Sequence, residues 1–342
     1  MLLRRLLTND ALAAFLTRAA LVILVVPVVA AFLFQAAVGL ASPPDPGVEV
    51  FSWALLGRSL FLAAVVAVLC GMIGAFCGVV AGRLSRAACA LALFAFVMPL
   101  AIPPSVHAYV WRNIALAAGL LGGLFVEGGA YAVNFSGAVL SMTSAFWTIP
   151  ALAAFAVAAG PARRYELEAR PFAPPSVAAR RILVPSVLPA AAAAAGLVFI
   201  LAFGEYGAVA LWQINTFPAH IMSMYLSTYQ MHTAAAASLV PALVTGLAAV
   251  VVFLVAAKAL AVTEVERVVV DRETLWRPSI GLKVILGVSV ALLVGAPLAV
   301  CGVYAFSEWS GFSAMGGIFE DLGWSVFFAC AAGILGAVIA VF

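Results

Sequence analysis

RRYELEARPFAPPSVAARRILVP, residues 163–185, concentrates charge in a chain that otherwise carries little of it. The stretch contains five arginines and two glutamates, whereas charged residues make up only 9% of the 342-residue sequence. Apolar runs long enough to cross a bilayer lie on both sides of it. The pattern predicts a polar loop between two membrane-spanning helices.

The composition of the whole chain supports a membrane protein. Hydrophobic residues make up 66% of the sequence, and the mean hydropathy is +1.20. A soluble domain of this size cannot bury so much apolar surface, so lipid must solvate most side chains. The apolar stretches are continuous rather than alternating, which excludes a transmembrane β-barrel and predicts an all-α polytopic membrane protein in contact with the lipid bilayer. The net charge is +3, without the basic stripe and interleaved aromatics of a nucleic-acid binder.

Apolar segments of about 20 residues predict eight transmembrane helices. The first follows a short basic lead and is too long for the apolar region of a cleaved signal peptide, so we expect it to be retained. The eight predicted spans are 20–40, 56–82, 87–110, 132–158, 186–204, 236–258, 284–305 and 322–342.

The distribution of basic residues predicts the orientation. With the N-terminus in the cytoplasm, fifteen of the seventeen lysines and arginines fall in cytoplasmic loops, and only Arg58 and Arg112 fall outside. The stretch 163–185 is then cytoplasmic. We expect a multi-pass protein of the bacterial inner membrane.

A short repeat predicts a duplicated organisation. LGRSLFLAA (56–64) and LGWSVFFAC (322–330) align without gaps, and each follows an apolar helix that contains a proline. We therefore expect four regions: a lead, first helix and outer loop at 1–55, a permease-like core at 56–258, a cytoplasmic linker at 259–283, and the first two helices of a second, incomplete half at 284–342. A complete second half would need about four more helices, so we expect a truncated second half.

The charged loop resembles a known motif. Counted from Glu166, its spacing is similar to the "EAA" loop in the permease subunits of binding-protein-dependent ABC importers. That resemblance implies that the loop forms a short helix that docks on a cytoplasmic ATP-binding subunit. The residues that match the motif, or are charged within it, are Glu166, Glu168, Ala173, Arg180, Arg181, Ile182 and Pro185.

The loop also departs from the family pattern. Leu167 and Glu168 stand where the family has two alanines, and Phe172 stands at the glycine position. Three prolines surround that position. Glycine would allow the chain to make a tight turn there, whereas prolines break a helix in a different way. We therefore expect altered docking geometry.

A second stretch strengthens the resemblance. FGEYGAVALW, 203–212, is similar to the signature that ends the next helix in permeases for sulfate, molybdate and ferric iron. Two permease units fused in one chain resemble the ferric-iron, thiamine and aminoethylphosphonate importers. The resemblance implies a type I importer fold, a homodimeric ATPase partner, an extracytoplasmic solute-binding protein, and a second permease half or companion chain.

Glu205, Tyr206 and Gly207 are the candidate residues of the translocation pathway. A carboxylate at the end of an apolar helix is costly near the bilayer interior and invites a functional explanation. Glu205 could line the pathway, hydrogen-bond a broken helix end, or face outer water. Gly207 could allow a turn or a close helix approach. Trp53, Trp111, Trp147 and Trp212 lie near predicted helix ends, which predicts an interfacial aromatic belt.

Other functions have less support in the sequence. The chain lacks a phosphate-binding GxxxxGK[ST] loop, so ATP hydrolysis would belong to a separate subunit. It also lacks the clustered acids and histidines of an intramembrane enzyme, and no cysteine pair or cysteine–histidine cluster predicts a metal site or cofactor. An ion-coupled transporter or channel without an ATPase remains the alternative, although such proteins usually carry charged residues within several spans.

Overall fold

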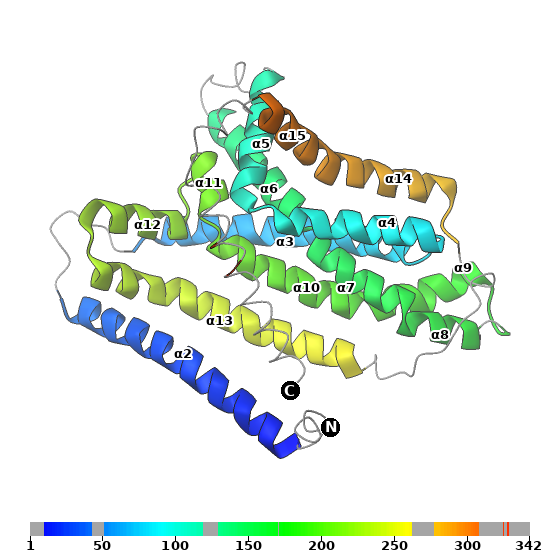
Figure 1. Cartoon of the computed structure of the whole chain (residues 1–342), viewed down its shortest axis with the longest axis horizontal. Coiled ribbons are helices and arrows are strands. Elements are labelled where there is room, and N and C mark those ends of the chain that lie inside the picture. The colour runs from blue at the N-terminus through cyan, green and yellow to red at the C-terminus, as the bar shows by residue number, and fades with distance from the viewer. Residues whose placement is uncertain are drawn as a thin grey trace. The chain divides into compact units, whose positions relative to one another are not determined.

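A computed structural model of the chain describes residues 10–42, 51–118, 129–169, 171–261 and 277–307, together with Trp324 and Phe327. Every element in these ranges is helical (Figure 1). The long helices are α2 (Asp10–Ala41), α3 (Trp53–Ala81), α6 (Gly129–Phe146), α10 (Val184–Gly204) and α13 (Met231–Ala261). The shorter helices are α4 (Arg86–Val97), η1 (Met98–Ala101), α5 (Pro104–Ala117), α7 (Thr148–Ala159), α8 (Pro161–Ala169), α9 (Pro175–Ala178), η2 (Ala179–Leu183), α11 (Gly207–Leu211), α12 (Phe217–Thr228), α14 (Ile280–Val290), η4 (Ala291–Gly295) and α15 (Ala296–Ser307).

The described helices confirm an all-α polytopic membrane protein. Five of them are long and apolar enough to span a bilayer, and a bent pair raises the number to six. The five spans are Trp53–Ala81, Val133–Ala159, Pro175–Gly204, Met231–Ala257 and Ile280–Ser307. Each overlaps one of the predicted segments. The predicted first span lies within α2, and the predicted eighth span, 322–342, lies outside the described residues except for Trp324 and Phe327.

The predicted span 87–110 is not one straight helix. α4 with η1 and α5 meet at an angle of 96°. Ile102 ends the 3₁₀ turn of η1, and the next two residues, Pro103 and Pro104, have no backbone N–H to continue a helical ladder. The helix therefore stops, and α5 restarts with Pro104 in its first turn, where a missing N–H costs nothing.

The chain forms two compact units. Unit 1 comprises Met1–Pro44, Met231–Ala236 and Gly302–Phe342, and unit 2 comprises Asp45–Gln230 and Ala237–Cys301. Within unit 1, α2 passes close to the beginning of α13, since a Cβ on Gly39 would collide with the His232 carbonyl group. Unit 2 holds all the candidate site residues.

The core of unit 2 is built on close approach of α3 and α7. α3 packs most extensively against α7 and α10. Two glycines on α3 make this possible: a Cβ on Gly74 would lie 2.5 Å from the Trp147 carbonyl oxygen, and one on Gly78 would overlap the Ala151 carbonyl. Small residues let helix backbones approach in membranes, where packing rather than water exclusion drives association. A residue larger than glycine at either position would force the helices apart.

Two π-helical segments occur before prolines. In η2 the Val184 N–H donates to the Ala179 carbonyl, and Pro185 follows directly. In η4 the Ala296 N–H donates to the Ala291 carbonyl, and Pro297 follows. A proline inside a helix leaves a carbonyl of the preceding turn without its usual donor. The wider π turn lets the chain rearrange its backbone bonds before that gap, so both helices continue through it.

Candidate functional site

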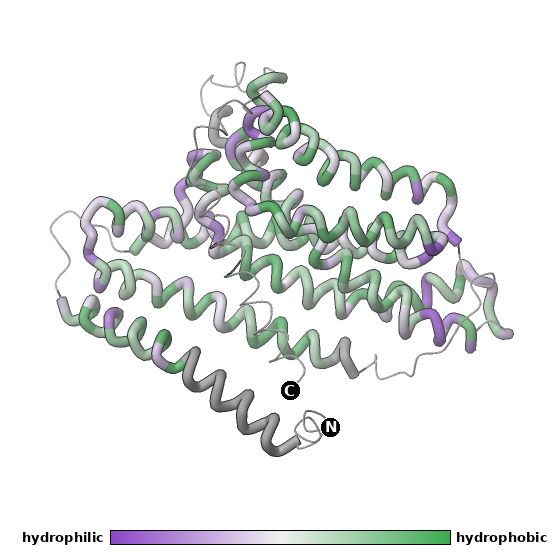
Figure 2. The backbone as a smooth tube through the Cα atoms, viewed as in Figure 1, coloured by the Kyte–Doolittle hydropathy of each residue, from purple (hydrophilic) through white to green (hydrophobic). Residues whose placement is uncertain are grey.

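Hydrophilic segments lie at one end of unit 2 (Figure 2). Most of their charged residues are basic, so we call it the basic end. There α3 turns into α4, α7 passes through α8 and α9 into α10, and α14 begins (Figure 1). The basic residues of these described segments are Arg83, Arg86, Arg163, Arg164, Arg180, Arg181, Arg277 and Lys283.

The charged loop is folded rather than extended. It begins as α8, turns at residues 171–174, and returns as α9 and η2, which run without interruption into α10. Prolines fix both starts, because Pro161 opens α8 and Pro175 opens α9 at positions that need no N–H. The sequence prediction placed the start of the following span at residue 186, whereas the helical span begins at Pro175.

The loop packs onto the helix ends through small apolar residues. Ala162 from α8, Ala179 and Leu183 from η2, and Ala158 from α7 are buried in one cluster. The small volume of the three alanines allows α8 to lie directly against η2, and Leu183 fills the space between them. The loop is thus part of the packed structure of unit 2.

Glu166 is tied to the turn between α3 and α4. Its Oε1 lies 2.6 Å from Nη2 of Arg83, and the two side chains are only 2% and 1% exposed. Burial lowers the pKa of Arg83, while Glu166 opposes this shift and Arg163 adds to it. Burial likewise raises the pKa of Glu166, against the opposing effect of Arg83 and Arg163. Each buried charge therefore depends on its partner to offset the loss of water.

The other residues predicted for the coupling loop face outward or line its turn. Glu168 is exposed and accepts a hydrogen bond from Arg164 Nε at 2.9 Å, an i,i+4 pair on the surface of α8. Arg180 and Arg181 lie in η2 and are exposed, Ala173 lies in the turn, and Ile182 is half-buried. Pro185 lies in the first turn of α10. Phe172, which replaces the family's glycine, is 88% exposed at the tip.

Glu205 lies in a break between two helices. α10 ends at Gly204, and α11 begins at Gly207. The Glu205 Oε1 accepts the Ala208 N–H at 2.9 Å, so the carboxylate caps the first turn of α11. Of the roles considered from sequence, the structure shows the hydrogen bond to a broken helix end. Tyr206 is partly exposed beside it.

Gly207 allows α11 to pack closely against α5. A Cβ there would lie 3.1 Å from the Cβ of Ser105 at the start of α5. Arg112 of α5 binds the other end of α11, because its Nη1 donates to the Leu211 carbonyl at 2.8 Å. α11 is therefore held at both ends, by a carboxylate at its N-terminus and a guanidinium at its C-terminus, as the helix dipole favours.

Replacing Glu205 tests whether its acceptor or its charge matters. Glu205→Gln keeps an oxygen for the Ala208 N–H, whereas Glu205→Ala removes it. We expect the alanine variant to lose about 1 kcal/mol of stability and the glutamine variant to lose much less. Thermal unfolding of the purified protein in detergent measures this. Equal destabilisation by both variants would contradict the capping role.

A buried polar network joins α5, α6 and the end of α11. Ser144 Oγ lies 2.9 Å from His107 Nδ1 and accepts a hydrogen bond from Trp111 Nε1. Three residues earlier on α6, Ser141 Oγ accepts from Trp212 Nε1 at 2.9 Å. Such hydrogen bonds between helices position neighbouring spans in a membrane.

The prediction of an aromatic belt is wrong for three of its four tryptophans. Trp53 is 78% exposed, but Trp111, Trp147 and Trp212 are buried in the core of unit 2. Trp111 and Trp212 find hydroxyl partners on α6, and the Trp212 ring lies over Gly137. Proximity to a helix end was a poor guide because the serines that pair with these rings lie far away in the sequence.

Sequence reasoning missed four residues of these sites. Arg83 was used only to orient the chain, yet it is the partner of Glu166. Ser141 and Ser144 were not singled out, although hydroxyls at i and i+3 in an apolar segment indicate one polar helix face. Ser59, from the repeated nine-residue motif, accepts the Phe217 N–H at 2.7 Å and so anchors the start of α12.

Comparisons with known proteins identify no relative. No family model matches the chain, and no curated protein sequence matches it. Among the described residues, no three or more His, Cys, Asp or Glu side chains are grouped so that they could hold a metal ion. The predicted repeat partner at 322–330 lies outside the described residues except for Trp324 and Phe327.

Proposed function

We propose that this chain is the permease subunit of an ATP-driven, binding-protein-dependent importer and forms a substrate pathway across the bacterial inner membrane. The observation that carries the proposal is the folded loop at the basic end, which presents Phe172, Arg180 and Arg181 to solvent. Aromatic residues and arginines are enriched at protein interfaces, so an exposed ring together with two exposed arginines on one loop supports a docking surface. The surrounding prolines stiffen the tip, so little conformational freedom is lost on docking.

The base of the loop supports a coupling role. The Arg83–Glu166 pair joins α8 to the α3–α4 turn, and α8 packs on η2 at the start of α10. A partner that moves the tip would therefore act on α3, α4 and α10 together. We propose that the partner is a cytoplasmic, homodimeric ATP-binding subunit, which places the basic end and the N-terminus in the cytoplasm.

The rest of the importer follows from the same proposal. The fold would be the type I importer fold with about eight spans, completed by a second permease half or a companion chain. A solute-binding protein would deliver the substrate at the opposite end of unit 2, where Glu205, Tyr206 and Gly207 would border the pathway. We propose ferric iron or a related small solute as substrate, such as aminoethylphosphonate, thiamine or an oxyanion.

An ion-coupled carrier has less support. Carriers of that kind hold their coupling ions or protons with carboxylates inside the membrane. The five described spans and the bent pair contain no aspartate or glutamate, and Glu205 follows the end of α10. Its carboxylate is already used to cap α11.

Substitutions at the exposed tip test the proposal. We expect Phe172→Ala to weaken binding of the ATP-binding subunit by roughly thirtyfold, because interface aromatic anchors typically contribute 2 kcal/mol or more. Arg180→Glu should weaken it as well, through charge reversal in the contact. Uptake of solute driven by ATP in proteoliposomes should fall in parallel. The measurements are copurification of the two subunits and uptake with the binding protein present.

Arg86→Glu is the matched control, since Arg86 is exposed at the same end but lies outside the loop. It reverses the same charge and should leave association unchanged. If Arg86→Glu weakened association as much as Arg180→Glu does, the loss would come from the changed net charge and not from a contact made by the loop. Uptake driven by an ion gradient without ATP would contradict the proposed function and favour the carrier.

A further inference from the structure

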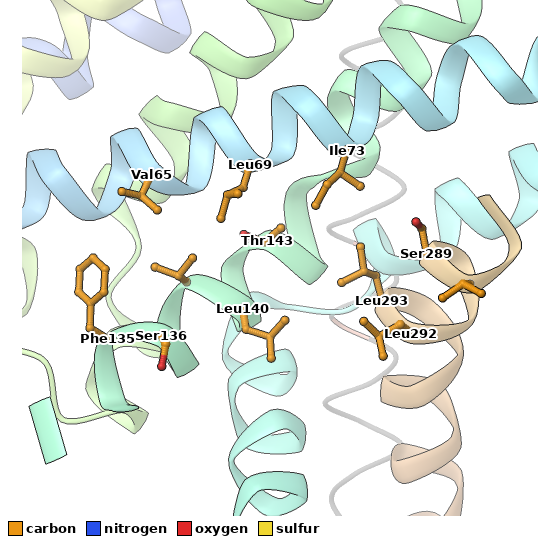
Figure 3. Close-up of a pocket in the computed structure, with 12 residues that line it drawn as sticks. Val65, Leu69, Ile73, Phe135, Ser136, Leu140, Thr143, Ser289, Leu292 and Leu293 are labelled. Atoms are coloured by element: carbon orange, nitrogen blue, oxygen red, sulfur yellow. The ribbon is translucent and has the colours of Figure 1, made fainter. Parts of the chain in front are cut away.

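A groove of about 510 Å³ opens between α3, α6 and the helix formed by α14 and η4 (Figure 3). All three walls belong to unit 2. Nine of its twelve lining residues are aliphatic or aromatic, and the other three carry hydroxyl groups. Ser136 uses its hydroxyl within its own helix, where it donates to the Val133 carbonyl. The described residues of the lining include no charged group, so water has little reason to fill the groove.

The mouth of the groove faces outward from the helix bundle. Leu69 on α3, Val288 on α14 and Leu292 on η4 form its rim, and all three are exposed. They lie within spans that cross the bilayer by length and composition, so the medium at the mouth is lipid hydrocarbon. The π turn of η4 carries Leu292 and Leu293 into the wall (Figure 3). If the groove were empty, the side chains that line it would lose van der Waals contacts, and a hydrocarbon chain that enters it restores them.

The dimensions of the groove suit a chain rather than a compact ligand. On α3 the lining extends from Val65 to Ile73, which is about 12 Å at 1.5 Å per residue. That length is comparable to one leaflet, about half of the ~30 Å hydrocarbon core. On α14 the lining begins at Val288, five residues after Lys283, or about 8 Å along the helix axis. An acyl chain in the groove therefore has its headgroup near the basic end.

The charge at that end selects the headgroup. Arg277 and Lys283 lie just before and in the first turn of α14, and both are exposed. Two exposed cations where the span Ile280–Ser307 begins favour an anionic headgroup over a zwitterionic one. We propose that the groove binds one acyl chain of an anionic phospholipid, whose headgroup lies at the basic end beside Arg277 and Lys283.

Native mass spectrometry of the full chain in mild detergent tests the proposal. The protein is purified, stripped of lipid, and titrated with phosphatidylglycerol or with phosphatidylcholine of the same acyl chains. We expect one tightly retained phosphatidylglycerol on the unsubstituted protein. Arg277→Gln and Lys283→Gln should each reduce the preference for phosphatidylglycerol about fivefold.

Variants that fill the groove provide the sharper comparison. Leu140→Trp places a larger side chain in the wall and should abolish retention. Leu292→Trp fills the groove from the half-exposed rim and leaves the core packing undisturbed. It is therefore the variant to use if Leu140→Trp fails to fold. Leu247→Trp is the matched control, because Leu247 is 70% exposed on α13 outside the groove, and it should retain the lipid.

Three results would overturn the proposal. Retention by Leu292→Trp equal to that by Leu247→Trp would show that the lipid binds elsewhere. An unsubstituted protein that retains no phospholipid would show that the groove does not bind one. Equal affinity for phosphatidylglycerol and phosphatidylcholine would contradict the proposed preference for an anionic headgroup.

Discussion

Arg83→Ala is expected to destabilise the protein by about 3–5 kcal/mol, because it leaves the Glu166 carboxylate buried without its partner. The pair is 2.6 Å long and both side chains are almost fully shielded from solvent. The stranded charge would either draw water into the cluster formed by Ala162, Ala179 and Leu183 or take up a proton. The change in stability is measured by thermal unfolding in detergent, monitored as the loss of the helical circular dichroism signal.

The chain offers a matched control for this variant. Arg164 and Glu168 form a second Arg–Glu pair on α8, but their side chains are 43% and 58% exposed. Exposed pairs contribute about 0–1 kcal/mol, so Arg164→Ala should be nearly neutral. The double variant Arg83→Met, Glu166→Leu should recover much of the lost stability, because it removes both buried charges. Equal effects of Arg83→Ala and Arg164→Ala would show that burial of the first pair does not matter.

This result bears on how coupling is tested. Glu166 is the first residue of the motif-like loop, and substitution there is the obvious choice for uncoupling an ATPase. Since its carboxylate faces Arg83 inside the fold, such a variant would lose transport through misfolding. Exposed residues of the loop, such as Phe172, separate docking from folding.

Gly78→Val is expected to prevent correct assembly of unit 2. Even a single Cβ at this position would overlap the Ala151 carbonyl oxygen of α7, and the neighbouring Ala154 side chain allows no sideways shift. Overpacking of a core typically costs about 1–3 kcal/mol, and a clash with backbone rather than with a flexible side chain lies at or above the top of that range. Size-exclusion chromatography and the yield of folded protein measure the loss.

Gly57→Ala is the control on the same helix. A Cβ on Gly57 meets no atom within 4 Å, and the residue is exposed. Alanine has the higher helix propensity, so this variant should be neutral or more stable by up to about 1 kcal/mol. A Gly78→Val protein that folds as well as Gly57→Ala would mean that α3 and α7 do not depend on close approach.

Apolar length predicted the positions of the spans because it reflects a requirement of the bilayer itself. It failed where local chemistry changes the helix path. The arginines at 180 and 181 lower the hydropathy of a segment that is nonetheless helical, so the span that starts at Pro175 was expected eleven residues later. The double proline at 103–104 interrupts the helical ladder, and the segment 87–110, which was expected as one span, has a 96° bend there.

The candidate sites were less predictable because they depend on contacts between distant residues. Glu166 was chosen for its place in a motif, but its partner lies 83 residues earlier, in a two-helix turn with no signal of its own. Glu205 was recognisable as an acid at a helix end, and its acceptor role is local to the next turn. Trp212 pairs with Ser141, 71 residues away, which no pattern near either residue indicates.

The sharp bend between η1 and α5 has a consequence for biosynthesis. α4 has 12 residues and α5 has 14, so they measure about 18 and 21 Å, and neither reaches across ~30 Å of hydrocarbon. Arg112 and Asn113 further lower the tendency of α5 to leave the translocon for lipid. The partners of two α5 side chains are supplied only later in translation: Ser144 for Trp111 and the Leu211 carbonyl for Arg112. We therefore expect membrane integration of this segment to wait for the downstream chain, as a step of tertiary folding rather than of helix-by-helix insertion.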